Sequence, residues 1–148
     1  MKMKKVLLLI ILLVGGYSSI NAQEWYTNME QAKQVALKEN KPIILVFQGS
    51  DWCTPCILLD RNVWSTDAFK EYAKSNYIMV KADFPRKKKN ALPEAQQDHN
   101  NKLAEKYNQN GYFPLVVILN SKGEKKGQTG FEKISAKEYI KLLNSFLK

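Results

Sequence analysis

The 148-residue sequence predicts an α/β domain in which a central mixed β-sheet is covered by helices on both faces. Residues 43–47 and 115–119 are wholly apolar, which is typical of strands buried on both sides. Residues 77–83 form a third strand-like segment, and segments with helical spacing of apolar residues alternate with the strands. A turn at 120–123 leads into a short polar edge strand at 124–128, so the sheet ends in a hairpin.

Several helical segments are expected around this sheet. The first spans residues 28–40, and Pro42 ends it before the first strand. The last opens with a capping box between Ser135 and Glu138. The other segments are one that starts at the cysteine motif, one that runs from Ser65 (the candidate N-cap) towards Tyr72, and one at residues 93–107.

The N-terminal 22 residues have the organisation of a secretory signal peptide. Lysines precede an unbroken apolar run at 6–14, and a small, polar segment ends at Ala22. The run is too short to cross a bilayer as a stable helix without its flanks. We therefore expect cleavage after residue 22 and a mature domain at 23–148 that is periplasmic or secreted. Anchoring by an uncleaved signal is the alternative.

The chain carries a formal net charge of +9, which falls to +6 when the three lysines and no acids of residues 1–22 are removed. Part of the excess lies in the run Arg-Lys-Lys-Lys at 86–89. Such runs can recruit nucleic acid or anionic lipid. Because no aromatic residues are interleaved with the run and export is expected, we predict a solvated loop and no nucleic-acid partner.

The two cysteines, Cys53 and Cys56, carry the most definite chemistry in the sequence. A structural disulfide stabilises mainly by closing a long loop, and a bridge between these positions closes almost none. The preceding strand delivers Cys53 to a helix start, where unpaired N–H groups and the helix dipole favour the thiolate. Cys56 lies one turn later, within reach of a disulfide with Cys53. We therefore expect Cys53 to be the nucleophile and Cys56 to resolve the mixed disulfide.

A metal site is an alternative use of the same pair. Zinc normally takes four protein ligands, and the one other good candidate is His99, which is expected to face solvent on its helix. A Cu(I) site made by the two thiolates stays open, because soft ligands suit that ion.

Two stretches of the sequence resemble the thioredoxin superfamily. KPIILVFQGSDWCTPC resembles the strand–Trp–CxxC–helix motif, and NQNGYFPLVVILNSKGE resembles the later segment in which a cis-proline precedes a strand and hairpin. The resemblance covers nearly all of residues 25–148 and implies a thioredoxin-like fold. It also implies that Trp52, Phe113 and Pro114 bind substrate, with Pro114 as the cis-proline and Phe113 offering backbone hydrogen bonds to an extended chain.

The stretch CTPCILLDRNVWS is similar to exported thioredoxin-like proteins and to the C-terminal periplasmic domain of the membrane thiol:disulfide interchange reductase. In that relative an acidic residue follows the second cysteine by four positions, which maps onto Asp60. Positions 53, 56 and 60 also share one helix face. Asp60 is therefore a candidate for raising the pKa of the thiols or accepting the proton of Cys56, with a solvated carboxylate as the alternative.

The sequence departs from thioredoxins at one position. Their buried acid, six residues before the first cysteine, is replaced by Phe47, which implies that this proton relay is missing or moved. Lys81 matches a partly buried lysine of the family, but without its acidic partner we expect an exposed lysine at the end of a strand.

These features predict an exported thiol–disulfide oxidoreductase that exchanges its Cys53–Cys56 pair with protein substrates and needs neither flavin nor metal. The reducing direction is preferred, and a monomer is expected. The predicted partners are protein thiols and disulfides, together with a protein that recharges the pair, such as a membrane thiol:disulfide interchange protein. The alternatives are a Cu(I)- or zinc-handling protein on this fold and a redox-inactive substrate-binding module.

Overall fold

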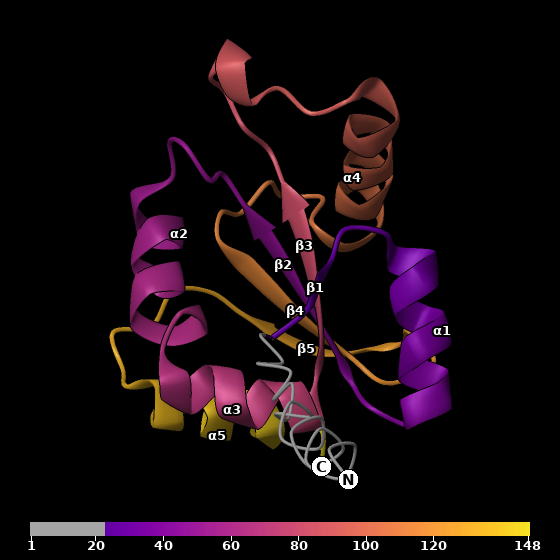
Figure 1. The fold of residues 1–148 in the computed structure, drawn as a ribbon, viewed down its shortest axis with the longest axis vertical. Coiled ribbons are helices and arrows are strands. Elements are labelled where there is room, and N and C mark those ends of the chain that lie inside the picture. Colours follow the sequence, from indigo (N-terminus) through magenta and orange to yellow (C-terminus); the bar gives the residue numbers. More distant parts are fainter. Residues whose placement is uncertain (1–22) are drawn as a thin grey trace, which may run out of the picture.

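A computed structural model describes residues 23–148, so the expected signal segment and its cleavage site lie outside the described residues. The described chain contains a five-stranded sheet in the order β1-β3-β2-β4-β5 (Figure 1). Its strands are β1 (Trp25–Tyr26), β2 (Ile43–Gln48), β3 (Ile78–Asp83), β4 (Leu115–Leu119) and β5 (Lys125–Thr129). β1, β3 and β2 are parallel, whereas β4 and β5 pair antiparallel, so the predicted mixed sheet is confirmed.

Helices cover both faces of this sheet (Figure 1). They are α1 (Met29–Glu39), α2 (Thr54–Leu59), α3 (Asp67–Asn76), α4 (Glu94–Tyr107) and α5 (Ala136–Ser145), with a π-helical turn at Asp60–Trp64 and a 3₁₀ turn at Lys88–Asn90. α2, α3 and α5 pack on one face, and α1 and α4 pack on the other. Each face of β2 and β4 is thereby removed from water, which explains why these strands are wholly apolar over most of their length.

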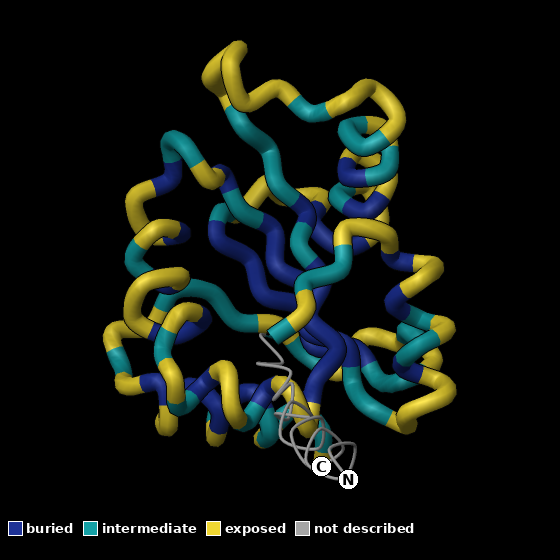
Figure 2. The backbone as a smooth tube through the Cα atoms, in the orientation of Figure 1, coloured by how far each residue is buried: buried dark blue, intermediate teal, exposed yellow. Residues whose placement is uncertain are grey.

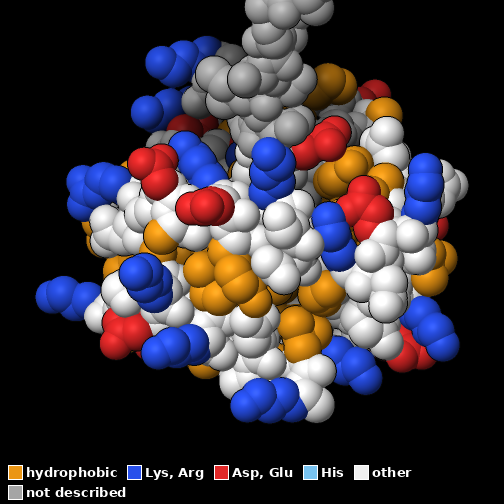
Figure 3. Space-filling model, turned by 60° about the horizontal axis from the view of Figure 1, so that its bottom comes forward, with side chains coloured by type: hydrophobic (Ala, Val, Ile, Leu, Met, Phe, Trp, Pro, Cys, Tyr) orange, Lys and Arg blue, Asp and Glu red, His pale blue; other side chains and the backbone are white. Residues whose placement is uncertain are grey.

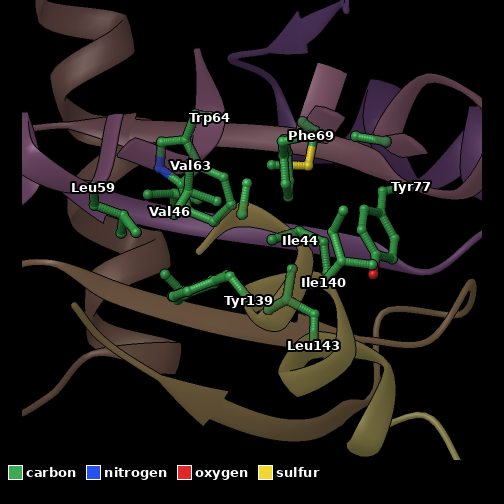
Figure 4. Close-up of a cluster of buried hydrophobic side chains, with 14 of the residues drawn as sticks. Ile44, Val46, Leu59, Val63, Trp64, Phe69, Tyr77, Tyr139, Ile140 and Leu143 are labelled. Atoms are coloured by element: carbon green, nitrogen blue, oxygen red, sulfur yellow. The ribbon is translucent and has the colours of Figure 1, made fainter. Parts of the chain in front are cut away.

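The core consists of two clusters of buried side chains, one on each face of the sheet. The buried positions are concentrated in the central strands (Figure 2). In the cluster under α2, α3 and α5, Trp64 contacts Phe69 and Tyr139 edge-on, with ring centroids 4.7 and 5.3 Å apart. Figure 4 shows Trp64, Phe69 and Tyr139 in one cluster with Val46 of β2 and Leu143 of α5. Edge-to-face contacts of this kind add about 0.5–1.5 kcal/mol each to the burial of the rings.

Three local features differ from the sequence-based expectation. β1 was not predicted, although it pairs in parallel with β3. The N-cap of α3 is Thr66, whose hydroxyl accepts from the Phe69 amide, so the prediction of Ser65 was wrong. Ser65 instead donates to the Asp60 carboxylate at 3.2 Å, because the wide π-helical turn before it brings these two side chains together.

His99 is also placed differently from the prediction. It is half-buried rather than facing solvent, and its Nε2 accepts a hydrogen bond from the Met29 amide at 3.1 Å. The Asn28 side chain accepts from the Gln31 amide at the same helix end. α4 therefore supplies part of the N-terminal cap of α1, because the first amides of a helix have no partners within it.

Within residues 23–148, none of the helices combines the length and the apolar character needed to span a membrane.

Candidate active site

The two cysteines lie where β2 ends and α2 begins, at the end of the sheet towards which the β2 and β3 arrows point (Figure 1). Cys53 is the N-cap of α2, and its amide donates to the Gly49 carbonyl at 2.9 Å. Pro55 lies in the first turn of α2, where a missing N–H leaves no helical hydrogen bond unmade. The strand, tight loop and helix therefore hold Cys53 at a fixed position.

Cys53 and Cys56 are joined by a disulfide, with their Cα atoms 5.2 Å apart. Both residues are buried, with 3% and 5% of their surface exposed. The Cys56 amide donates to the Cys53 sulfur at 3.3 Å. A hydrogen bond from a backbone amide favours the thiolate of Cys53 over its thiol once the disulfide is opened.

Trp52 lies directly before Cys53 in the chain. Its indole N–H donates to the Phe84 carbonyl at 2.8 Å, and its ring lies edge-on to Phe113 with centroids 5.4 Å apart. Gly49 lies directly against the indole: a Cβ there would come within 2.2 Å of the ring, so a larger residue would displace Trp52. On the ring face, the guanidinium of Arg86 lies 3.6 Å from the centroid.

The Phe113–Pro114 peptide bond is cis. Both residues line an open groove of about 530 Å³ whose lining also includes Pro55, directly before Cys56, and Gly130. The structure therefore places Phe113 and Pro114 beside the cysteine motif, although they lie about sixty positions along the chain from it.

A second pocket, of about 290 Å³, reaches Cys56 from the side of the sheet. It is lined by Gln48, Ser50, Cys56, Ile57, Asp60 and Lys81. Asp60 is exposed at its mouth, whereas Lys81 is half-buried and its ammonium lies 4.8 Å from the centre of the Trp25 ring. The expectation of an exposed lysine was wrong, because the pairing of β3 with β2 turns Lys81 towards the helix that carries Cys56.

Phe47 does not face this pocket. Its side chain is fully buried in the cluster under α1 and α4, and its ring lies 6.5 Å from that of Phe84. The neighbouring side chain, Gln48, points to the opposite face of the sheet and lines the pocket with Cys56. The position six residues before Cys53 therefore lies on the face of the sheet opposite to Cys56. The polar groups near Cys56 come from Gln48, Asp60 and Lys81.

Asp51 is a site residue that the sequence did not reveal. Its carboxylate accepts hydrogen bonds from the amides of Arg86 and Lys87, both at 3.0 Å, and from the Asn90 side chain at 2.9 Å. These bonds, the one from the Arg86 amide foremost, lower the pKa of Asp51. Because the partners lie 35 to 39 positions away, no local pattern signals the contact.

Within the described residues, no group of three or more histidine, cysteine, aspartate or glutamate side chains has the arrangement of a metal site. His99, the one additional ligand considered from the sequence, bonds to the start of α1.

Comparison with known proteins agrees with this geometry. A family model described as thioredoxin-like matches residues 24–121. The chain is 36% identical over 120 residues, covering 81% of its length and 68% of the relative, to a protein of Chlamydia pneumoniae named disulfide bond reductase DsbH.

Solved structures show the same likeness. A structure titled DsbH oxidoreductase aligns with a TM-score of 0.78 and 32% identity, covering 85% of each chain. The reduced C-terminal domain of DsbD from Neisseria meningitidis aligns with a TM-score of 0.54 and 20% identity over 79% of this chain and 92% of that one. The second likeness concerns the fold alone.

Proposed function

The chain belongs to the thioredoxin-like family and is a thiol–disulfide oxidoreductase, and we propose that it acts outside the cytoplasm as a reductase of protein disulfides. The reducing direction is supported by its 36% identity to a disulfide bond reductase. Export is supported by the signal-like sequence of residues 1–22.

The first proposed step is attack by the Cys53 thiolate on one sulfur of a substrate disulfide. A bond forms between Cys53 and that sulfur, the substrate disulfide breaks, and the other substrate sulfur leaves as a thiolate that takes a proton from water. The amide of Cys56 donates to the Cys53 sulfur, which supports the thiolate as the resting form of the reduced site.

The second step is attack by Cys56 on the Cys53 sulfur. This closes the Cys53–Cys56 disulfide and releases the second substrate thiolate, so two electrons have passed from the protein to the substrate. The Cys56 thiol must first lose its proton. Asp60 shares a pocket with Cys56, and we assign its carboxylate as the acceptor that passes this proton to solvent.

Substrate binding is assigned to the groove beside Pro114. An extended peptide would hydrogen-bond to the backbone of Phe113 and rest against its ring. We also assign Trp52 to substrate binding, because its ring lies edge-on to that of Phe113. The groove is open and largely uncharged, so it fits a range of peptide sequences.

The observation that carries the proposal is the Cys53–Cys56 pair held between the groove and the Asp60 pocket. A glutathione titration of this pair tests the direction. A potential near about −270 mV, that of thioredoxin, supports a reductase, whereas a value near about −120 mV would make the protein an oxidant. A Cys56→Ser variant should accumulate mixed disulfides through Cys53, and Cys53→Ser should accumulate none.

Each turnover leaves the protein oxidised, so a second protein must return it to the dithiol. We propose that a membrane thiol:disulfide interchange protein supplies these electrons and that protein disulfides receive them. Cell fractionation tests the location: mature protein starting near Gln23 in the periplasm or medium supports export, and full-length protein in the cytoplasm contradicts it.

A further inference from the structure

The segment 84–92, which joins β3 to α4, is the most strongly charged part of the described surface. It contains Arg86, Lys87, Lys88 and Lys89 and no acidic residue. All four are exposed (Figure 2, top). We call residues 86–89 the basic loop.

The basic loop is fastened to the active site. The Asp51 carboxylate accepts from two of its amides and from Asn90, and Asp51 lies two positions before Cys53. The Arg86 guanidinium covers a face of the Trp52 ring at 3.6 Å. These contacts hold the start of the basic loop at the end of the sheet that carries the disulfide (Figure 1).

Within the described residues, none of the four cationic side chains of the basic loop forms an ion pair. The ion pairs found there join Lys33 to Glu30 and Lys41 to Glu39, both far from the loop in sequence. Two acids lie nearby. The Asp51 oxygens accept from backbone amides and an Asn side chain, and their charge also attracts Lys87. The Asp83 oxygens accept from Ser50 and from the Phe84 amide. At the opposite end of the molecule, acidic and basic side chains are interspersed (Figure 3).

We propose that the basic loop docks an acidic segment of the protein substrate, next to the substrate disulfide that Cys53 attacks. This inference rests on the proposed reductase function and specifies its substrates. Cations beside a reacting site raise the local concentration of an anionic partner and its association rate. Selection by charge would complement the groove at Pro114, which no charged side chain among the described residues lines.

An anionic protein fits the loop better than other polyanions. Nucleic-acid sites stack bases on aromatic rings, but the Trp52 ring face beside the loop is covered by Arg86. Surfaces that bind membranes usually add apolar side chains that enter the lipid, whereas the four residues of the basic loop are all cationic and apolar residues only flank it, at 84–85 and 91–92.

The test uses three peptides that share one disulfide and carry flanking Glu, Gln or Lys residues. Rates of reduction by the dithiol protein are measured at low salt and at about 1 M salt, where the Debye length is only about 3 Å. At low salt the Glu-flanked peptide should react roughly tenfold faster than the Lys-flanked one. The preference should vanish at high salt and in a Lys88→Glu/Lys89→Glu variant.

The matched control is Lys70→Glu/Lys137→Glu, which makes the same charge change on exposed positions of α3 and α5. This control should still reduce the Glu-flanked peptide faster than the Lys-flanked one. If both variants lost this preference equally, the proposal would be overturned. Rates that do not depend on flanking charge would overturn docking while leaving the reductase intact. No reduction of the Gln-flanked peptide would overturn the reductase as well. Binding to anionic lipid vesicles through Lys88 and Lys89, without a peptide preference, would assign the loop to a membrane instead.

Discussion

Two aspartates near the cysteines have the same chemistry and different environments. The Asp51 carboxylate accepts three hydrogen bonds from residues 86–90, and these hydrogen bonds lower its pKa. Asp60 accepts from the Ser65 hydroxyl and otherwise opens to the pocket that contains Cys56. A carboxylate that accepts several N–H donors holds structure in place, whereas one with most of its lone pairs free can receive a proton.

For Asp60, replacement by Asn should slow the attack of Cys56 on the mixed disulfide, by up to about 10²-fold near neutral pH. Asn keeps an oxygen for Ser65 but cannot hold the proton, so the rate should recover as pH rises and hydroxide removes the proton directly. Stopped-flow release of the second substrate thiol across pH measures this step. Asp98→Asn, on exposed α4, is the control, and an unchanged pH profile in Asp60→Asn would exclude Asp60 as the acceptor.

For Asp51, replacement by Asn should release the basic loop. One of its two acceptor atoms becomes an N–H donor facing other donors, so amide exchange at Arg86 and Lys87 should accelerate. Because the folded pKa lies below the unfolded value near 3.9, the wild-type carboxylate stabilises the fold above that pH. This contribution is lost as pH falls through the folded pKa. Asp51→Asn should therefore be less stable at neutral pH, and its free energy of unfolding should fall less steeply as the pH is lowered. Equal amide exchange rates at Arg86 and Lys87 in the two proteins would contradict the role of Asp51 in holding the basic loop.

At the scale of elements, α1 depends on a residue from another helix. His99 of α4 accepts from the Met29 amide, and Asn100 of α4, 1% exposed, donates to the Asp83 carbonyl at the end of β3. α4 is thus held to both α1 and the sheet by side chains that a helical pattern marks as polar. The low apolar content of α4 is compensated by these hydrogen bonds.

Replacing His99 by Ala should therefore lower the free energy of unfolding by about 1 kcal/mol, the usual cost of losing a helix cap. Urea denaturation measures the change, and amide exchange at Met29 locates it. Asp98→Ala alters the adjacent exposed position of the same helix and should be nearly neutral. Equal effects of the two replacements would show that the His99 bond adds nothing to stability.

The sequence could predict those elements whose pattern is contained in a few consecutive residues. β2 and β4 are continuous apolar runs, and the capping box of α5 is contained in four residues, so they were predicted from the sequence. β1 has two residues and exists through its pairing with β3, which no local pattern encodes. The choice of Thr66 over Ser65 as N-cap follows from the π-helical turn that precedes it.

At the scale of the whole molecule, the sheet separates the chemistry from a second core. Side chains of β2 alternate between the α1–α4 layer and the layer that contains Cys56. The cysteines, Trp52 and Pro114 could be identified from sequence because their motifs are local. The face of the sheet to which Phe47 or Gln48 points depends on how the strand lies between the two helical layers. The polar side chains near Cys56 could therefore be identified only from the structure.

This layering predicts opposite results for acids placed at adjacent positions of β2. Phe47→Asp would put an unpaired carboxylate among the apolar side chains under α1 and α4, and should destabilise the fold by several kcal/mol. Gln48→Glu would put the carboxylate in the pocket with Lys81 and Cys56, where a cation and solvent are within reach. It should fold, and it should change the pH dependence of the Cys56 step. Urea denaturation and stopped-flow kinetics measure the two effects. A Phe47→Asp variant as stable as the wild type would contradict the assignment of Phe47 to the far face of the sheet.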